Sequence, residues 1–144
     1  MVDGRISKEL KQFVAERAGE CCEYCRSQAR FSSDSFSIEH IVPQSRGGNS
    51  DPANLAFSCQ GCNNRKFTAT EAVDPSTGEF APLYDPRRHR WSEHFAWNED
   101  FTVMLGLTPT GRATIAKLAL NREGVVNLRR VLRAAGEHPP VSVD

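Results

Sequence analysis

Hydrophobic positions near the start of the chain recur at the spacing of an amphipathic helix. Between residues 6 and 18, apolar side chains return every three or four positions with charged side chains between them. Ser7 stands where a hydroxyl could cap the first turn by accepting a backbone N–H. The segment therefore predicts a helix that packs one face against a core. That face is formed by Ile6, Leu10, Phe13 and Val14.

The middle of the chain changes to a pattern typical of strands. Residues 36–43 are rich in β-branched and aromatic side chains and end at a proline, which predicts a strand. Residues 44–53 are dense in turn formers, and residues 54–58 then predict a short returning strand. No helix breaker occurs over residues 63–72, so we expect a helix there that ends before Asp74 and Pro75. The predicted layout is strand, loop, strand and helix.

The last third of the chain predicts a hairpin followed by helices. Residues 91–97 carry aromatic side chains at alternate positions, residues 98–100 predict a turn, and residues 101–105 return as a strand. Helices are expected over residues 108–120 and 123–135. The aromatic face of this hairpin could stack on nucleic-acid bases, although such a face more often belongs to a core.

Length and element order together predict an α+β fold in one domain. A chain of 144 residues and 16.0 kDa suits a single domain over residues 1–144. We expect a core at about residues 20–74 and a C-terminal extension at about residues 85–136. A segment rich in proline and glycine, residues 75–86, connects them, and residues 136–144 are expected to form a loose end.

Composition excludes several classes of protein. Charged residues make up 25% and hydrophobic residues 39%, which fits neither a disordered tail nor a membrane protein. No apolar run approaches the roughly 18 residues of a membrane-spanning helix. The N-terminus lacks the apolar stretch of a signal peptide, so a cytoplasmic location is expected.

The charges balance overall but not locally. The chain has 18 basic and 18 acidic residues, so its net charge is zero. Between Arg112 and Arg133, however, six basic residues face a single acidic one, which suits either a nucleic-acid surface or a solvated helical face. A neutral chain predicts modest affinity for DNA by itself and leaves room for an additional protein that gives specificity. The oligomeric state is not predicted.

The cysteines predict a metal site and not a disulfide framework. The chain has five cysteines, an odd number, and four of them form two CxxC pairs. Two such pairs can direct four thiolates onto one ion, and structural zinc suits that geometry. Buried free thiols, a redox-active CxxC pair and a rubredoxin-like iron site are the alternatives. The predicted ligands are Cys22, Cys25, Cys59 and Cys62, with Cys21 as a spare thiol or a replacement for Cys22.

The segment between and after the two pairs carries an ordered set of motifs. These are Glu39-His40-Ile41-Val42-Pro43, then Gly47-Gly48, then Asn54-Leu55, then Cys59-Gln-Gly-Cys62-Asn63-Asn64-Arg65-Lys66. In this order they resemble the HNH endonucleases, the ββα-metal nucleases, in the version framed by four zinc-binding cysteines. The resemblance is close over about residues 22–66. Residues 85–91 and 106–114 also resemble the tail of compact stand-alone HNH proteins.

The resemblance implies a metal-dependent endonuclease that acts on DNA. Hydrolysis of a phosphodiester needs a base that activates water and a cation that neutralises the transition state. His40 is the candidate base because an imidazole of ordinary pKa is largely neutral at cellular pH. Glu39 and Asn63 offer hard oxygen ligands, which favour Mg²⁺ or Mn²⁺ as the catalytic metal. Asn63 stands where many relatives carry His, so the chain is an H-N-N variant.

Three further groups of residues complete the predicted site. Asn54 matches the family's middle Asn, which tethers the loop and orients the base, although Asn54 alone would suggest an Asx turn. Arg65 and Lys66 follow on the helix and could hold a flanking phosphate, or they belong to a solvated face. Arg46 in the glycine-rich loop is a weaker candidate for the same contact.

Other functions remain open at this stage. A structural, hydrogen-bonded histidine is the alternative for His40, and a non-catalytic zinc module that binds DNA or protein is the alternative for the whole chain. Such a module predicts that the side chains of Glu39, His40 and Asn63 do not converge. An RNase of the same fold is also consistent with the residues, because this chemistry needs no 2′-hydroxyl. Electron transfer through an iron site is a more distant possibility.

Overall fold

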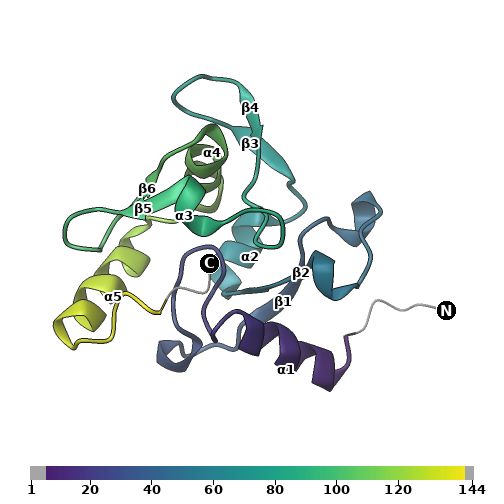
Figure 1. The fold of residues 1–144 in the computed structure, drawn as a ribbon, viewed down its shortest axis with the longest axis horizontal. Helices are drawn as coiled ribbons and strands as arrows, with labels where there is room; N and C mark the ends of the chain where they lie inside the picture. Colours follow the sequence, from purple (N-terminus) through teal and green to yellow (C-terminus); the bar gives the residue numbers. More distant parts are fainter. Residues whose placement is uncertain (1–5, 142–144) are drawn as a thin grey trace.

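The computed structural model describes residues 6–141 and has an α+β architecture (Figure 1). Its helices are α1 (Lys8–Arg17), α2 (Gln60–Lys66), α3 (Trp91–His94), α4 (Pro109–Leu118) and α5 (Glu123–Ala134). Its strands are β1 (Ser37–His40), β2 (Leu55–Ser58), β3 (Glu71–Val73), β4 (Phe80–Pro82), β5 (Phe95–Trp97) and β6 (Met104–Gly106). Within the described part of the chain, the strands form three antiparallel pairs, β1–β2, β3–β4 and β5–β6.

The β1–β2 hairpin separates two hydrophobic clusters. Alternate side chains of a strand point to opposite faces, and Leu55 and Phe57 of β2 pack against Val14 of α1. Ala56, between them, belongs to the larger cluster around the cysteines. The pairing of Glu39 with Ala56 extends this division to β1, so Glu39 lies on the cysteine side of the hairpin.

Helix α1 forms as its sequence pattern predicts. The Ser7 hydroxyl oxygen accepts a hydrogen bond from the backbone N–H of Leu10, which satisfies a donor that the first turn leaves free. Val14 and Ala18 are completely buried against the hairpin, while Phe13 stays about half exposed. The helix thus covers the back of the hairpin through a narrower face than its apolar residues suggest.

The predicted helix over residues 63–72 is wrong at both ends. Helix α2 already begins at Gln60, because Cys59 acts as its N-cap and its sulfur accepts the backbone N–H of Cys62. It ends at Lys66, and Phe67 adopts a positive φ of 49° that no helix can continue. The chain then forms β3, which begins inside the predicted helix, and β3 pairs with β4, which lies in the predicted connection of residues 75–86.

The C-terminal part keeps the predicted hairpin and both helices, with two differences. Trp91 belongs to the short helix α3, and the strand β5 begins only at Phe95. Helix α4 packs against β3, β4 and β6, which joins the last third of the chain to the segment after α2.

The segment after α5 packs against the rest of the molecule as far as Val141. His138 is buried, and one of its ring nitrogens lies 2.8 Å from the carbonyl oxygen of Phe101. The Glu137 carboxylate pairs with Arg30. The predicted loose end is therefore wrong over this described portion, and residues 142–144 lie outside the described residues.

A search of the described helices for one that is both long and apolar enough to cross a bilayer finds none.

Candidate functional site

Four cysteine thiols converge at the base of the hairpin. The sulfur atoms of Cys22, Cys25, Cys59 and Cys62 all lie within 4.8 Å of one another, and all four residues are buried. The Cys25 and Cys59 sulfurs are 3.7 Å apart. A tetrahedral zinc ion with Zn–S bonds of about 2.3 Å places its sulfur ligands about 3.8 Å apart. The four thiols are therefore positioned to bind a metal ion, and their arrangement is consistent with zinc.

Both CxxC pairs use the same local geometry. The backbone N–H of Cys25 donates to the Cys22 sulfur at 3.4 Å, and that of Cys62 donates to the Cys59 sulfur at 3.4 Å. Cys21 takes no part, because its thiol donates to the carbonyl oxygen of Gly19. The structure therefore brings together the sulfur atoms of the four predicted cysteines, and the Cys21 sulfur lies outside this cluster.

An arginine from the far end of the chain also reaches the thiols. The Arg122 guanidinium lies 3.5 Å from the Cys59 sulfur and 3.6 Å from the Cys62 sulfur. Gly61 makes this approach possible, because a Cβ atom there would stand 2.6 Å from an Arg122 nitrogen. Sequence analysis counted Arg122 only as one charge of a basic stretch. Its contact depends on how α4 packs on α2, which no local pattern reveals.

Glu39 lies on the buried side of the hairpin and is held by two partners. Its side chain is 5% exposed, and its carboxylate accepts a hydrogen bond from the Tyr24 hydroxyl. The Lys66 ammonium lies 3.2 Å from the other carboxylate oxygen and donates to the Ile41 carbonyl at 2.9 Å. Burial raises the pKa of the Glu39 carboxyl, while Lys66 and Tyr24 oppose that rise.

Lys66 differs from its expected position. The sequence suggests a surface lysine that holds a phosphate or faces solvent, but the side chain is only 2% exposed. It is buried because the last turn of α2 directs it toward the hairpin, where the Glu39 carboxylate compensates its charge. In this arrangement Lys66 does not present its ammonium to a phosphate at the surface.

His40 ends β1 and lies on the other face of the strand. One ring nitrogen is 2.9 Å from the Ser50 hydroxyl, and the residue is partly exposed. Burial, and secondly the positive charge of Lys66, hold the pKa of His40 below its ordinary value. The imidazole is therefore mostly neutral at neutral pH, as a proton acceptor must be.

Asn54 ties the loop to the end of β1. Its amide oxygen accepts the backbone N–H of Val42 at 2.9 Å, and its amide nitrogen donates to the carbonyls of Val42 and Asn49. The loop passes so close to this point that a Cβ atom on Gly48 would stand 1.7 Å from the Val42 oxygen. These contacts fix the loop that carries Ser50, the partner of His40.

Asn63 lies within α2, three positions before Lys66 on the same face of the helix. Its side chain is partly buried, and its amide makes no hydrogen bond to any residue between 6 and 141. Glu39, by contrast, has a partner on each carboxylate oxygen. The ion pair therefore links Glu39 to Lys66, and among the described residues no side chain or backbone group is hydrogen-bonded to the Asn63 amide.

The two predicted arginines occupy the surface. Arg65 is exposed, and its guanidinium donates to the carbonyl oxygen of Gly61 at 3.2 Å. Arg46 is also exposed, and its Nε donates to the carbonyl oxygen of Thr68 at 2.7 Å. Each keeps nitrogen atoms available for a further acceptor, because a guanidinium carries five N–H donors.

Sequence analysis missed Tyr24 and Ser50 as partners of the central residues. Tyr24 was a spacer of the first CxxC pair, and Ser50 was one of several turn residues. Each contact joins positions that are at least ten residues apart, and neither has a motif of its own. The sequence held no signal that could have identified them.

Comparison with known proteins gives one match. Residues 22–68 match the family model described as HNH endonuclease, a range that includes all four thiols and every predicted nuclease residue. Neither the curated proteins nor the solved structures contain a match to the chain.

Proposed function

Residues 22–68 form an HNH endonuclease domain, and from this premise we propose that the protein is a metal-dependent endonuclease that hydrolyses DNA phosphodiester bonds. The observation that carries the proposal is His40, a partly exposed imidazole with a lowered pKa inside the matched segment. The HNH domain by itself indicates a nuclease-type function and a nucleic-acid substrate. DNA as the substrate, and one cut strand per active site, are the finer parts of the proposal.

His40 is proposed as the general base. A neutral imidazole can take a proton from the water that attacks the phosphorus atom, and the Ser50 hydroxyl holds the ring in place. Asn54 supports this position indirectly, because it fixes the loop from which Ser50 projects. His40, Ser50 and Asn54 are therefore held together at the end of β1, where His40 could activate water.

We propose two metals with different tasks. Zinc in the four-thiol site is structural, and the buried, closed set of sulfur ligands supports that role. Glu39 and Asn63 are proposed to hold Mg²⁺ or Mn²⁺. The free amide of Asn63 fits such a role, and a carboxylate with about four acceptor positions retains capacity beside Tyr24 and Lys66. The metal would supply positive charge that stabilises the transition state.

The surface arginines are proposed to hold flanking phosphates. Arg65 is exposed on α2, the helix that also carries Asn63, and Arg46 is exposed in the loop between β1 and β2. Contacts of this kind fix the register of nucleic acid without reading its sequence. The zero net charge of the chain leaves specificity to an additional protein, which we keep as part of the proposal.

Nicking of supercoiled plasmid tests the proposal. Parental protein should convert plasmid to the open-circular form with Mg²⁺ or Mn²⁺ and show little activity with Zn²⁺ or without added metal. His40→Ala should lose at least about 10²-fold in rate, the usual scale for a general base. Gln44→Ala, an exposed change in the same loop, should leave the rate unchanged. Nicking by His40→Ala at the parental rate would contradict the proposed mechanism.

One observation favours a second candidate, a non-catalytic module that binds nucleic acid or protein. The Glu39 carboxylate is buried against Tyr24 and Lys66, which is also how a purely structural carboxylate would be held. The same experiment decides between them when a matched RNA is added. Cleavage of RNA alone identifies an RNase, and binding without cleavage of either substrate identifies the module.

A further inference from the structure

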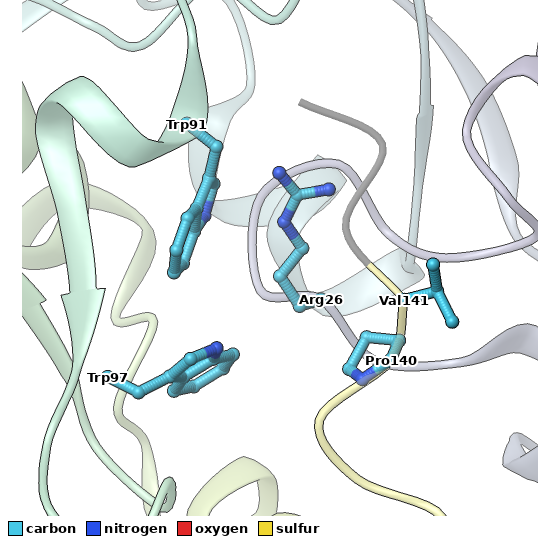
Figure 2. A pocket seen from close by; sticks show the side chains of 5 residues that line it. All are labelled: Arg26, Trp91, Trp97, Pro140 and Val141. Atoms are coloured by element: carbon cyan, nitrogen blue, oxygen red, sulfur yellow. The ribbon is translucent and has the colours of Figure 1, made fainter.

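A small cavity lies between the C-terminal hairpin and the first CxxC pair, away from the residues proposed for catalysis (Figure 2). Its volume is about 30 Å³, and it is lined by Arg26, Trp91, Trp97, Pro140 and Val141. Arg26 directly follows the thiol ligand Cys25, the tryptophans come from α3 and β5, and the last two residues follow α5. Three separate parts of the chain therefore build this space.

Arg26 is the unusual member of the lining. The residue is only 9% exposed, yet its guanidinium makes no hydrogen bond or ion pair with any described residue. Its one recorded interaction is with the ring of Trp91, whose centroid lies 5.1 Å from the guanidinium carbon. No guanidinium nitrogen of Arg26 is both buried and without a partner, so the group keeps contact with solvent. A small anion that reaches it would gain charge-assisted hydrogen bonds.

The two tryptophans add further donors without acceptors. The Trp91 indole nitrogen is buried and has no hydrogen-bond partner, and the Trp97 indole makes no hydrogen bond to a described residue either. Figure 2 shows both indole nitrogens on ring edges that face the space beside Arg26. Buried indole N–H groups usually find a partner. Among the described residues, the side chains that line the cavity therefore supply a guanidinium and two indole N–H groups, and none of them supplies an acceptor.

The tryptophan faces are already covered, so the cavity does not suit a stacked base. Trp91 packs against Phe95 at a centroid distance of 5.6 Å, and the Arg129 guanidinium lies 5.0 Å from the Trp97 ring. The His138 and Trp97 rings are nearly perpendicular, and their centroids lie 4.9 Å apart. A volume of about 30 Å³ also admits only a few atoms. Only the donor edges remain free for a ligand.

Arg17 and Arg87 line a second cavity with Arg26 and have the polar partners that Arg26 lacks within the described part of the chain. Arg17 donates to the carbonyls of Pro52 and Leu55. Arg87 pairs with Glu23 and donates to the Leu55 carbonyl. Among the described residues, no carboxylate lines the cavity beside the tryptophans, although Arg26 also lines a neighbouring cavity together with Glu23. The chemistry that fits this space is a small oxyanion.

We propose that the cavity binds one phosphate group of the nucleic acid, outside the position that is cut. The choice of nucleic acid as the source of the phosphate rests on the proposed nuclease function, whereas the oxyanion chemistry does not. Phosphate oxygens accept hydrogen bonds from a guanidinium and from indole N–H groups, and they neutralise the Arg26 charge. Bound there, the backbone would be anchored by Arg26 and Trp91.

Intrinsic fluorescence gives a direct test, because the two tryptophans of the chain are Trp91 and Trp97. Zinc-loaded His40→Ala protein, without other divalent metal, is titrated with inorganic phosphate and separately with a short DNA duplex. Both titrations should give a saturable change in fluorescence. Arg26→Gln should weaken phosphate binding at least about tenfold and reduce the salt slope of DNA binding by about one. Arg90→Gln, an equal loss of charge at an exposed neighbour, should change neither.

Trp91→Phe provides a second variant in case Arg26→Gln fails to fold, as judged by zinc content and circular dichroism. Phe keeps an aromatic ring at this position but has no indole N–H group, so phosphate binding should weaken several-fold. Trp97 remains as the fluorescent reporter. No saturable change in the parent, or unchanged phosphate affinity in the folded variants, would show that water alone fills the cavity. Phosphate binding combined with an unchanged DNA salt slope would overturn the nucleic-acid assignment.

These outcomes are separable from a failure of the proposed nuclease. Plasmid nicking that persists without phosphate binding would contradict only the inference about the cavity. Phosphate and DNA binding by a protein that never nicks would contradict only the catalytic proposal.

Discussion

The four-thiol site at the base of the β1–β2 hairpin and the pair Glu39–His40 on its first strand are built in opposite ways. The four thiols come from two local loops of equal spacing, and they converge within 4.8 Å in a buried cluster. Glu39 and His40 are neighbours in sequence, yet the strand turns them to opposite faces with different partners. The four-thiol site is thus specified by local spacing, whereas the proposed nuclease residues depend on contacts from distant segments.

This difference predicts which substitutions should unfold the protein and which should only change its activity by degrees. A closed sulfur site either holds its ion or loses it, and the fold follows, because binding energy is folding energy in such sites. The nuclease residues sit on a hairpin that α1 and α2 already support. Changes there should alter rate, metal preference or pH response while the fold persists.

Loss of a thiol ligand should have the largest effect. Cys59→Ser should lose the zinc and unfold the core, since structural zinc contributes on the order of 10 kcal/mol to small domains. Metal analysis and thermal melting measure this. Cys21→Ser is the matched control, because its sulfur contacts only the Gly19 carbonyl and lies outside the cluster. One zinc per chain in Cys59→Ser, with a parental melting curve, would remove Cys59 from the ligand set.

Breaking the buried pair should come second. Lys66→Met leaves the Glu39 carboxylate buried without its cation, which costs roughly 3–5 kcal/mol of stability. It should also raise the pKa of His40, because the charge of Lys66 contributes to lowering it. Nicking needs neutral His40, so the rate of the variant should begin to fall at a higher pH than that of the parent.

A pH–rate profile and thermal melting measure both effects of Lys66→Met. Lys117→Met, an exposed lysine of α4, is the control and should change neither. Since burial is the larger cause of the lowered His40 pKa, the parent should stay active below pH 6.5, the ordinary value for histidine. An unchanged profile in Lys66→Met would show that the titrating group is not His40.

Substitutions of Asn63 should have the smallest effects, and these should appear in the metal requirement of nicking. Asn63→Ala should need far more Mg²⁺ or Mn²⁺ for the same nicking rate, with zinc content unchanged. Asn63→His should move the preference toward Ni²⁺ or Co²⁺, because imidazole binds these ions more strongly than an amide oxygen does. The measurement is a metal titration of nicking, with Gln44→Ala, an exposed change in the loop, as the control. A parental titration in Asn63→Ala would reduce Asn63 to a helix residue and make Asn64 the next candidate.

Much of the fold could be predicted because its signals are local. Ser7 caps α1, the two CxxC pairs form matching loops, and the hairpin follows from β-branched residues on either side of a turn-rich segment. The end of α2 could not be predicted, because Phe67 stops the helix through a backbone conformation that its residue type does not favour.

The parts of the site that were not predicted all depend on tertiary packing. Lys66 has the sequence signature of a surface residue, and only the position of Glu39 across from the helix explains its burial. The position of residues 136–141 depends on contacts with Phe101 and Arg30, which lie far away in the sequence. Short-range patterns contain no information about such partners.

The contact of Arg122 with the thiols has a consequence for how the HNH domain of this protein can be transferred to other proteins, in evolution or by engineering. Residues 22–68 look like a portable cassette, yet two of their sulfurs receive hydrogen bonds from a residue that lies well beyond the cassette. Grafting that segment alone onto another protein would leave those sulfurs short of donors and of a compensating positive charge. The space that Gly61 leaves for the guanidinium would then be unfilled. A workable transplant must carry the C-terminal helices with it or supply an equivalent cation.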